Sequence, residues 1–165
     1  MTLETARSVR VADEVWIAAA LLHRENPERT EFTVSEIVER AEKEGVGGEL
    51  RPSVYVHAVQ HCVANRAPNP GRYRMLVETG KNLRRLFRPG DSYHPERDGS
   101  KTVPSKRDIP TKYHPLLDWY ISDYVLRRAQ LKKEDSLLAL RGIGKGLWAD
   151  EDPDSYVRRL REGWE

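Results

Sequence analysis

The residues best suited to a chemical task lie in a basic segment near the middle of the chain. Residues 72–88 contain six lysine or arginine side chains and only one acid, Glu78. Clustered cations bind the phosphates of a polyanion, because their approach releases condensed counterions. The side chains of this segment that we expect to contact a nucleic-acid backbone are Arg72, Arg74, Lys81, Asn82, Arg84, Arg85 and Arg88.

A second group of candidate residues comes just before this segment. Between Pro52 and Asn65 apolar residues recur at helical spacing, and the remaining positions carry no acid. Base edges are read by hydrogen-bonding side chains that have no competing carboxylates nearby. The residues that we assign to contacts in a DNA groove are Arg51, Ser53, Tyr55, His57 and Gln60.

The charge distribution along the chain points the same way. Residues 51–133 carry 17 lysines and arginines against 7 acids, whereas residues 1–50 and 134–165 are both net negative. A basic middle between acidic ends favours a surface that faces nucleic acid. The alternative is a solvated basic face that binds nothing.

Three helices are expected ahead of the basic segment. The first covers residues 12–25, where apolar residues share one face. The second begins with a capping box formed by Thr33 and Glu36, flanked by a hydrophobic staple, and ends at Gly45. The third covers residues 52–65 and starts at Pro52, a residue favoured in the first helical turn.

The helical period then changes to an alternation of apolar and polar residues. Two runs of this kind, 72–78 and 82–88, are separated by a turn from Thr79 to Asn82, which predicts a β-hairpin. Three helices followed by a hairpin is the order of the winged helix-turn-helix, and residues 12–88 resemble winged-helix regulators in this layout. We therefore expect a mainly α protein with a small hairpin, whose winged helix-turn-helix domain covers residues 1–90.

Three further segments follow this domain. Residues 91–114 are rich in Pro, Gly and Ser and predict an irregular loop or linker. Residues 115–133 predict a helix that packs on the first domain or against a copy of itself, as in a homodimer. Its expected apolar stripe consists of Leu116, Leu117, Tyr120, Ile121, Tyr124 and Val125. Residues 134–165 form an extended, partly helical tail that we expect to bind a partner.

The end of the tail carries the most specific motif of the chain. Residues 144–165, GKGLWADEDPDSYVRRLREGWE, resemble the C-terminal toxin-binding segment of VapB-type antitoxins. The resemblance implies that the tail binds a PIN-domain ribonuclease toxin through Trp148, Tyr156, Arg158, Arg159, Leu160 and Trp164. The tail has too little apolar area to fold alone, so docking on its own domain is an equal alternative.

Other classes of function find little support in the sequence. No set of nucleophile, base and acid stands out, so we do not expect an enzyme. His57 and His61 are four residues apart beside Cys62, but no third metal ligand is nearby, and we expect neither a metal nor a cofactor. The motif around Gly142 to Gly146 lacks the spacing of a phosphate-binding loop.

The cellular compartment and the overall function can also be predicted. No apolar run is long enough to span a membrane, and the first residues do not form a secretory signal. The single cysteine, Cys62, suits a reducing cytoplasm. We expect a cytoplasmic transcriptional regulator that binds double-stranded DNA and serves as the antitoxin of a toxin–antitoxin pair. The alternative is a winged-helix adaptor that binds proteins and no DNA.

Overall fold

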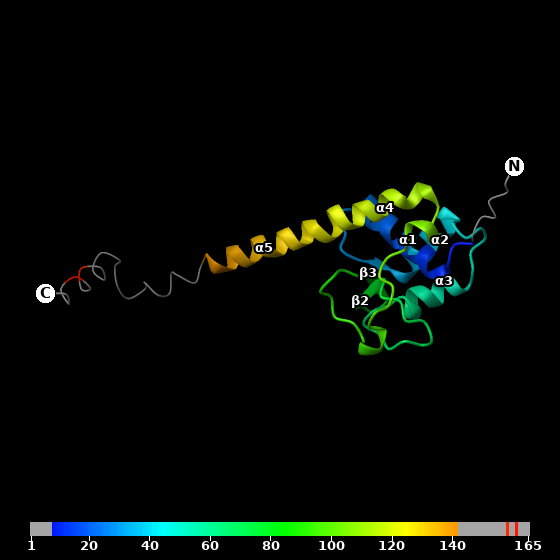
Figure 1. Cartoon of the computed structure of the whole chain (residues 1–165), viewed down its shortest axis with the longest axis horizontal. Helices are drawn as coiled ribbons and strands as arrows, with labels where there is room; N and C mark the ends of the chain where they lie inside the picture. The colour runs from blue at the N-terminus through cyan, green and yellow to red at the C-terminus, as the bar shows by residue number, and fades with distance from the viewer. Residues whose placement is uncertain (1–7, 142–157, 159–160, 162–165) are drawn as a thin grey trace. The chain divides into compact units, whose positions relative to one another are not determined.

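The computed structural model describes residues 8–141 together with Arg158 and Arg161 (Figure 1). The protein is mostly helical, with a small three-stranded antiparallel sheet. Its chain divides into two compact units, Met1–Ser122 and Asp123–Glu165, which are considered separately below. The mainly α architecture with a small hairpin is thus confirmed. No helix within the described residues is long and apolar enough to cross a membrane.

The first two helices form as the sequence predicts. Helix α1 (Val11–Glu25) lies in the centre of the first unit and buries Asp13 and Glu14 along with its apolar residues. Helix α2 (Val34–Glu44) begins with the expected capping box. In it, Thr33 Oγ1 accepts a hydrogen bond from the Glu36 amide at 3.2 Å, and a Glu36 carboxylate oxygen accepts one from the Thr33 amide at 2.8 Å. Gly45 closes α2 in the left-handed conformation.

The third helix is shorter than predicted and changes its period. Helix α3 (Ser53–Val56) continues into a π-helical segment, η1 (His57–His61), where the amide of Cys62 donates to the His57 carbonyl. The helix ends there instead of near Asn65, because Ala64 hydrogen-bonds to Leu76 of the next strand. Of the apolar residues that recur at helical spacing here, Val54, Ala58 and Cys62 are buried, whereas Val56 is 43% exposed.

The hairpin is confirmed, and it carries a third strand that the sequence did not predict. Strands β2 (Leu76–Gly80) and β3 (Leu83–Leu86) are antiparallel, and β1 (Phe32–Thr33) pairs with β3, giving the order β1-β3-β2. The hairpin strands are shorter than the runs 72–78 and 82–88. Strict alternation at the start of β2 is wrong, because Met75, Leu76 and Val77 are all buried. Both faces of the sheet are therefore covered there.

The segment predicted to be an irregular loop contains three short 3₁₀ turns. These are η2 (Pro95–Arg97), η3 (Lys106–Asp108) and η4 (Thr111–Tyr113). Arg97, Ile109 and Tyr113 of this segment are buried in the first unit. The segment is therefore a packed part of that unit, held by a few buried side chains instead of by regular structure.

The last helical stretch starts where expected and runs further. Helix α4 (His114–Trp119) belongs to the first unit, the π-helical segment η5 (Tyr120–Val125) crosses the unit boundary, and α5 (Leu126–Leu140) belongs to the second unit. The predicted helix was to end near Lys133. Four residues of its predicted apolar stripe are buried, but Ile121 is 61% exposed, which corrects that assignment.

Candidate nucleic-acid interface

Arg51, expected in a DNA groove, is tied to the first helix. Its Nε donates to a carboxylate oxygen of Glu14 at 3.2 Å, and its Nη2 donates to the same oxygen and to the Val9 carbonyl at 3.0 Å. Glu14 is buried in α1, so an unpaired carboxylate there would be costly. The guanidinium of Arg51 thus compensates a buried charge and fixes the start of α3 against α1.

The exposed side chains at the start of the third helix are neutral, as the sequence predicts. Ser53 and His57 are one turn apart and partly exposed, and Tyr55, on the other side of the helix, is 56% exposed. His57 Nδ1 lies 2.8 Å from the Ser53 carbonyl oxygen, and its ring stacks edge-on against His61 at 4.8 Å. Burial lowers the pKa of His57, which keeps its imidazole neutral at physiological pH. These side chains offer hydrogen-bonding groups without a fixed charge.

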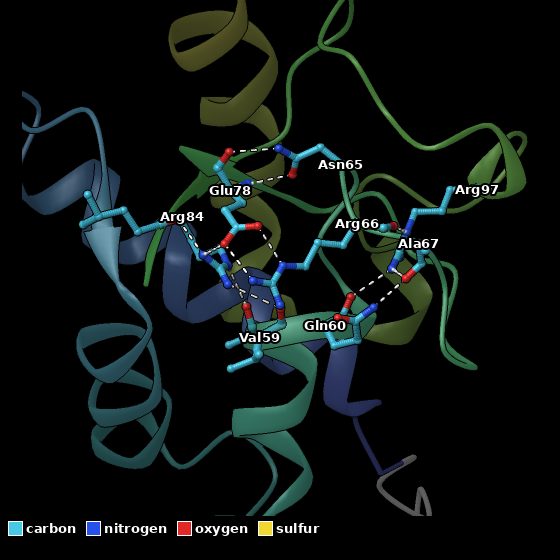
Figure 2. A network of polar contacts seen from close by, with 10 residues as sticks. Val59, Gln60, Asn65, Arg66, Ala67, Glu78, Arg84 and Arg97 are labelled. Carbon is cyan, nitrogen blue, oxygen red and sulfur yellow. Dashed lines mark hydrogen bonds and ion pairs between the residues drawn. The ribbon is translucent and has the colours of Figure 1, made fainter. Parts of the chain in front are cut away.

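Gln60 lies at the far end of the same helix and turns toward the chain. Its side-chain amide donates to the carbonyl of Ala67, as Figure 2 shows. The segment after η1 therefore folds back over Gln60. Among the residues assigned to the groove, Ser53 and His57 lie together on one side of the helix and Tyr55 is exposed on another side, whereas Arg51 and Gln60 are engaged within the unit.

Arg84 was expected in the basic wing, but its side chain is only 1% exposed. Its guanidinium donates to the carbonyls of Ala58 at 3.1 Å and Val59 at 3.3 Å, and it lies 3.4 Å from Glu78. Figure 2 shows Glu78 between Arg84 and Arg66, which holds the same carboxylate through two hydrogen bonds. Arg84 therefore joins β3 to η1 and does not face solvent.

Arg97 is a second buried arginine, and sequence reasoning missed it. It is completely buried and has no carboxylate partner among the described residues. Its guanidinium donates to five backbone carbonyls, those of Gln60, His61, Arg66, Ala67 and Tyr73, at 2.6 to 3.4 Å. Only the fold brings these carbonyls together, so no sequence pattern predicts the role of Arg97.

Arg84 and Arg97 together provide hydrogen-bond donors for the last carbonyls of η1. The last carbonyls of a helix have no partner within it, and they carry the negative end of the helix dipole. Here Arg84 binds the carbonyls of Ala58 and Val59, and Arg97 binds those of Gln60 and His61. We call these two residues the helix-end cations, because they cap η1.

The other wing arginines also have partners. Arg85 forms two hydrogen bonds to Asp91, at 2.6 and 2.8 Å, and Asp91 also accepts one from the Arg88 amide. Burial alone would raise the pKa of Asp91, but these hydrogen bonds lower it. Arg74 lies 4.3 Å from the centre of the Tyr93 ring and donates to the Ser100 carbonyl. Many of the arginines that were predicted to form a cationic surface therefore pair with groups of the first unit.

Exposed side chains of the wing are found at its turn and at its entry. Lys81 and Asn82 form the turn between β2 and β3, where Asn82 adopts a positive φ of 59°. Both side chains are exposed and make no hydrogen bond to a described residue. We call this pair the wing tip. Arg72 is also exposed, with one hydrogen bond of 3.3 Å to the Glu96 carbonyl.

The predicted partner-binding tail lies mostly outside the described residues. Of its candidate residues, Arg158 is described, in helical backbone and exposed. The others, which lie outside that description, are Trp148, Tyr156, Arg159, Leu160 and Trp164. The described part of the chain contains no group of three or more His, Cys, Asp or Glu side chains that could hold a metal ion.

Comparison with protein-family models, with curated proteins and with solved structures found no match. The function is therefore argued from the geometry of the chain.

Proposed function

We propose that the first unit is a winged helix-turn-helix domain that binds double-stranded DNA and regulates transcription. The observation that carries the proposal is a third helix without acidic residues, 53–61, followed by a hairpin in the element order α1–β1–α2–α3–η1–β2–β3. Pairing of β1 with β3 ties the hairpin to the start of α2, so the wing and the helix are held by one scaffold. A rigid scaffold of this kind suits groove recognition.

In this proposal α3 enters the major groove and the wing tip reaches the DNA backbone. Ser53, Tyr55 and His57 supply hydrogen-bonding groups and no carboxylate, as base reading requires. Lys81 supplies an exposed cation for phosphate. Since the helix-end cations are buried, affinity rests on fewer charges than the sequence predicts. We therefore expect a modest dependence of the affinity on salt.

Gel-shift titration at two salt concentrations tests the proposal. The probes are the duplex that precedes the protein's own coding sequence and a random duplex of equal length. Replacing Lys81 by Ala removes one phosphate contact, so the slope of log affinity against log salt falls by about 0.9. Lys43→Ala, which removes an exposed charge from α2, is the matched control and leaves the slope unchanged. Absence of binding by the unaltered chain at low salt contradicts the proposal.

We further propose that the protein is the antitoxin of a toxin–antitoxin pair. Support comes from the likeness of residues 144–165 to VapB-type antitoxin tails. The gene beside that of this protein is then expected to encode a PIN-domain ribonuclease. Co-expression of the two chains gives a complex, and removing residues 142–165 abolishes it while DNA binding persists. A complex that survives the truncation contradicts the assignment of the tail.

A second candidate function is that of an adaptor that binds proteins and no DNA. The observation in its favour is the exposed apolar surface at Leu50, Tyr55 and Val56, on and just before α3. Apolar side chains grouped on a surface mark contact sites for proteins as well as for thymine methyl groups. Complex formation with a partner, combined with no DNA binding at low salt, would select the adaptor.

A further inference from the structure

A polar pocket lies where the start of the described chain meets the segment after the wing. It has a volume of about 470 Å³ and lies between residues 8–10 and residues 101–108. The described residues that line it are all polar or charged, namely Ser8, Arg10, Lys101, Ser105, Arg107 and Asp108. The two segments are some 90 residues apart in the sequence, so only the fold assembles this N-terminal pocket.

Two of the charged residues in the lining are engaged with each other and with the helix below. Lys101 Nζ lies 2.7 Å from Asp13 Oδ1 and 3.3 Å from Asp108 Oδ2. Asp13 is completely buried in α1, so Lys101 compensates a carboxylate that has left water. The carboxylate of Asp108 is held by the same ammonium group. These ion pairs fix one wall of the pocket, where one ammonium group faces two carboxylates, so a positive charge in the pocket depends on its two arginines.

The two arginines of the pocket differ from Lys101, because they form no ion pair with a described residue. Arg10 and Arg107 are exposed, and neither side chain makes a hydrogen bond or an ion pair with a described residue. Each guanidinium carries five N–H donors in a planar fork. Two guanidinium groups beside the serine residues at positions 8 and 105 thus provide many donors and a net positive charge.

We propose that the N-terminal pocket binds a phosphate group. Guanidinium forks match the geometry of phosphate oxygens and form paired, charge-assisted hydrogen bonds with them. Because none of the described lining residues is apolar, they provide no surface for a hydrocarbon or an aromatic ring. The ligand is therefore recognised by its phosphate, while the rest of it remains near solvent.

The position of the pocket indicates the source of that phosphate. Val9 lies between the pocket residues Ser8 and Arg10, and its carbonyl accepts a hydrogen bond from Arg51 just before α3. The pocket therefore borders the start of the helix that we propose to enter the DNA groove. This step rests on the proposed function, and it makes a phosphate of the DNA backbone the expected occupant. The other source is a free phosphate compound.

The first experiment tests the pocket without DNA. The Nε–Hε signals of Arg10 and Arg107 are followed by NMR in the full chain during titration with inorganic phosphate, against sodium chloride at equal ionic strength. We expect saturable shifts of both signals, and an affinity at least about tenfold weaker for Arg10→Gln with Arg107→Gln, measured on signals of neighbouring amides. The control, Arg24→Gln with Lys43→Gln, removes the same charge from exposed sites and binds phosphate normally. Shifts that match those in chloride overturn the proposal.

The second experiment identifies the source. If the DNA backbone supplies the phosphate, the Arg10→Gln, Arg107→Gln chain has a salt slope for duplex DNA that is lower by about one to two. If a small compound supplies the phosphate, a nucleoside monophosphate binds the unaltered chain, and the double variant binds it more weakly by the same factor as inorganic phosphate. The DNA affinity of the variant is then unchanged. Phosphate binding without any DNA binding would contradict the proposed function and leave the pocket standing.

Discussion

The two arginines that cap η1 and the lysine of the wing tip have opposite surroundings. Arg84 and Arg97 are buried, and their guanidinium groups donate to carbonyls at the end of η1. Lys81 at the wing tip is exposed and has no described partner. All three side chains carry one positive charge, and Lys81 and Arg84 belong to the same basic segment, 72–88. The difference shows that nearby unsatisfied carbonyls, and not the local density of arginine, decide which cations stabilise the fold and which can meet a ligand.

The largest effect should follow from removing the buried arginine that binds most carbonyls. Arg97→Ala removes a donor from five backbone carbonyls, of which those of Gln60 and Ala67 keep a second donor, so we expect a loss of about 3 to 5 kcal/mol in the free energy of unfolding. Urea denaturation followed by circular dichroism measures it. Arg97→Lys should recover little, because an ammonium cannot reproduce the planar fork. Full stability of either variant would mean that the carbonyls find other partners.

A pH titration should show that the folded protein disfavours a positive charge on the imidazole of His23. His23 is buried, its ring packs edge-on against Phe32, and Nε2 accepts a hydrogen bond from the Leu86 amide at 3.4 Å. Burial, together with Arg88, Arg85 and Arg29, lowers its pKa from 6.5 to about 3. The unfolded chain therefore binds this proton first, and stability present above pH 6.5 is lost as the pH falls toward 3.

Between pH 7 and pH 4 the expected loss is at most about 3.5 kcal/mol, since each pH unit below 6.5 removes about 1.4 kcal/mol. Stability measured by urea denaturation between pH 7 and pH 4 tests it. His23→Gln keeps an acceptor for Leu86 and removes the titration, so its stability should depend less on pH across that window. An equally steep dependence in the variant would assign the loss to the carboxylates.

Arg84→Met should have an intermediate effect. The substitution keeps an apolar stem of similar length but leaves the carbonyls of Ala58 and Val59 without their donor, so we expect a loss of about 2 to 3 kcal/mol. Because Arg84 is buried, DNA affinity corrected for the folded fraction should remain unchanged. A selective loss of DNA binding at full stability would show that Arg84 reaches the ligand.

The smallest effect on stability is expected at the wing tip. Lys81→Ala should change the free energy of unfolding by no more than about 0.5 kcal/mol, since the side chain is exposed and makes no hydrogen bond or ion pair with a described residue. The measurement is the same urea titration, made beside Lys43→Ala as control. A large loss at Lys81 would remove the contrast between the two regions.

Local signals in the sequence predicted local structure well. The capping box of Thr33 and Glu36 and the turn around Asn82 involve residues a few positions apart, so their chemistry is written in consecutive residues. The end of the third helix was predicted less well, because pairing of Ala64 with Leu76 overrides the helical pattern that continues to Asn65. Strand β1 is two residues long and has no pattern of its own.

The candidate surface was predicted in part. Ser53, Tyr55 and His57 of the acid-free third helix are at least partly exposed, although on two different sides of it, and the turn of the hairpin is exposed. The engagement of Arg51 by Glu14 and of Arg85 by Asp91 could not be foreseen, since a cation and its carboxylate partner need only be close in space. The N-terminal pocket escaped the sequence for the same reason.

The sequence by itself determined where helices begin, where the hairpin turns and where positive charge accumulates, because these depend on neighbours along the chain. The tertiary structure alone decided what each cation does. It placed carbonyls of η1 around Arg84 and Arg97, left Lys81 in solvent, and brought Arg10 to Arg107 across one pocket. A guanidinium has the same charge in every place, and its role follows from whether the fold surrounds it with acceptors or leaves it facing water.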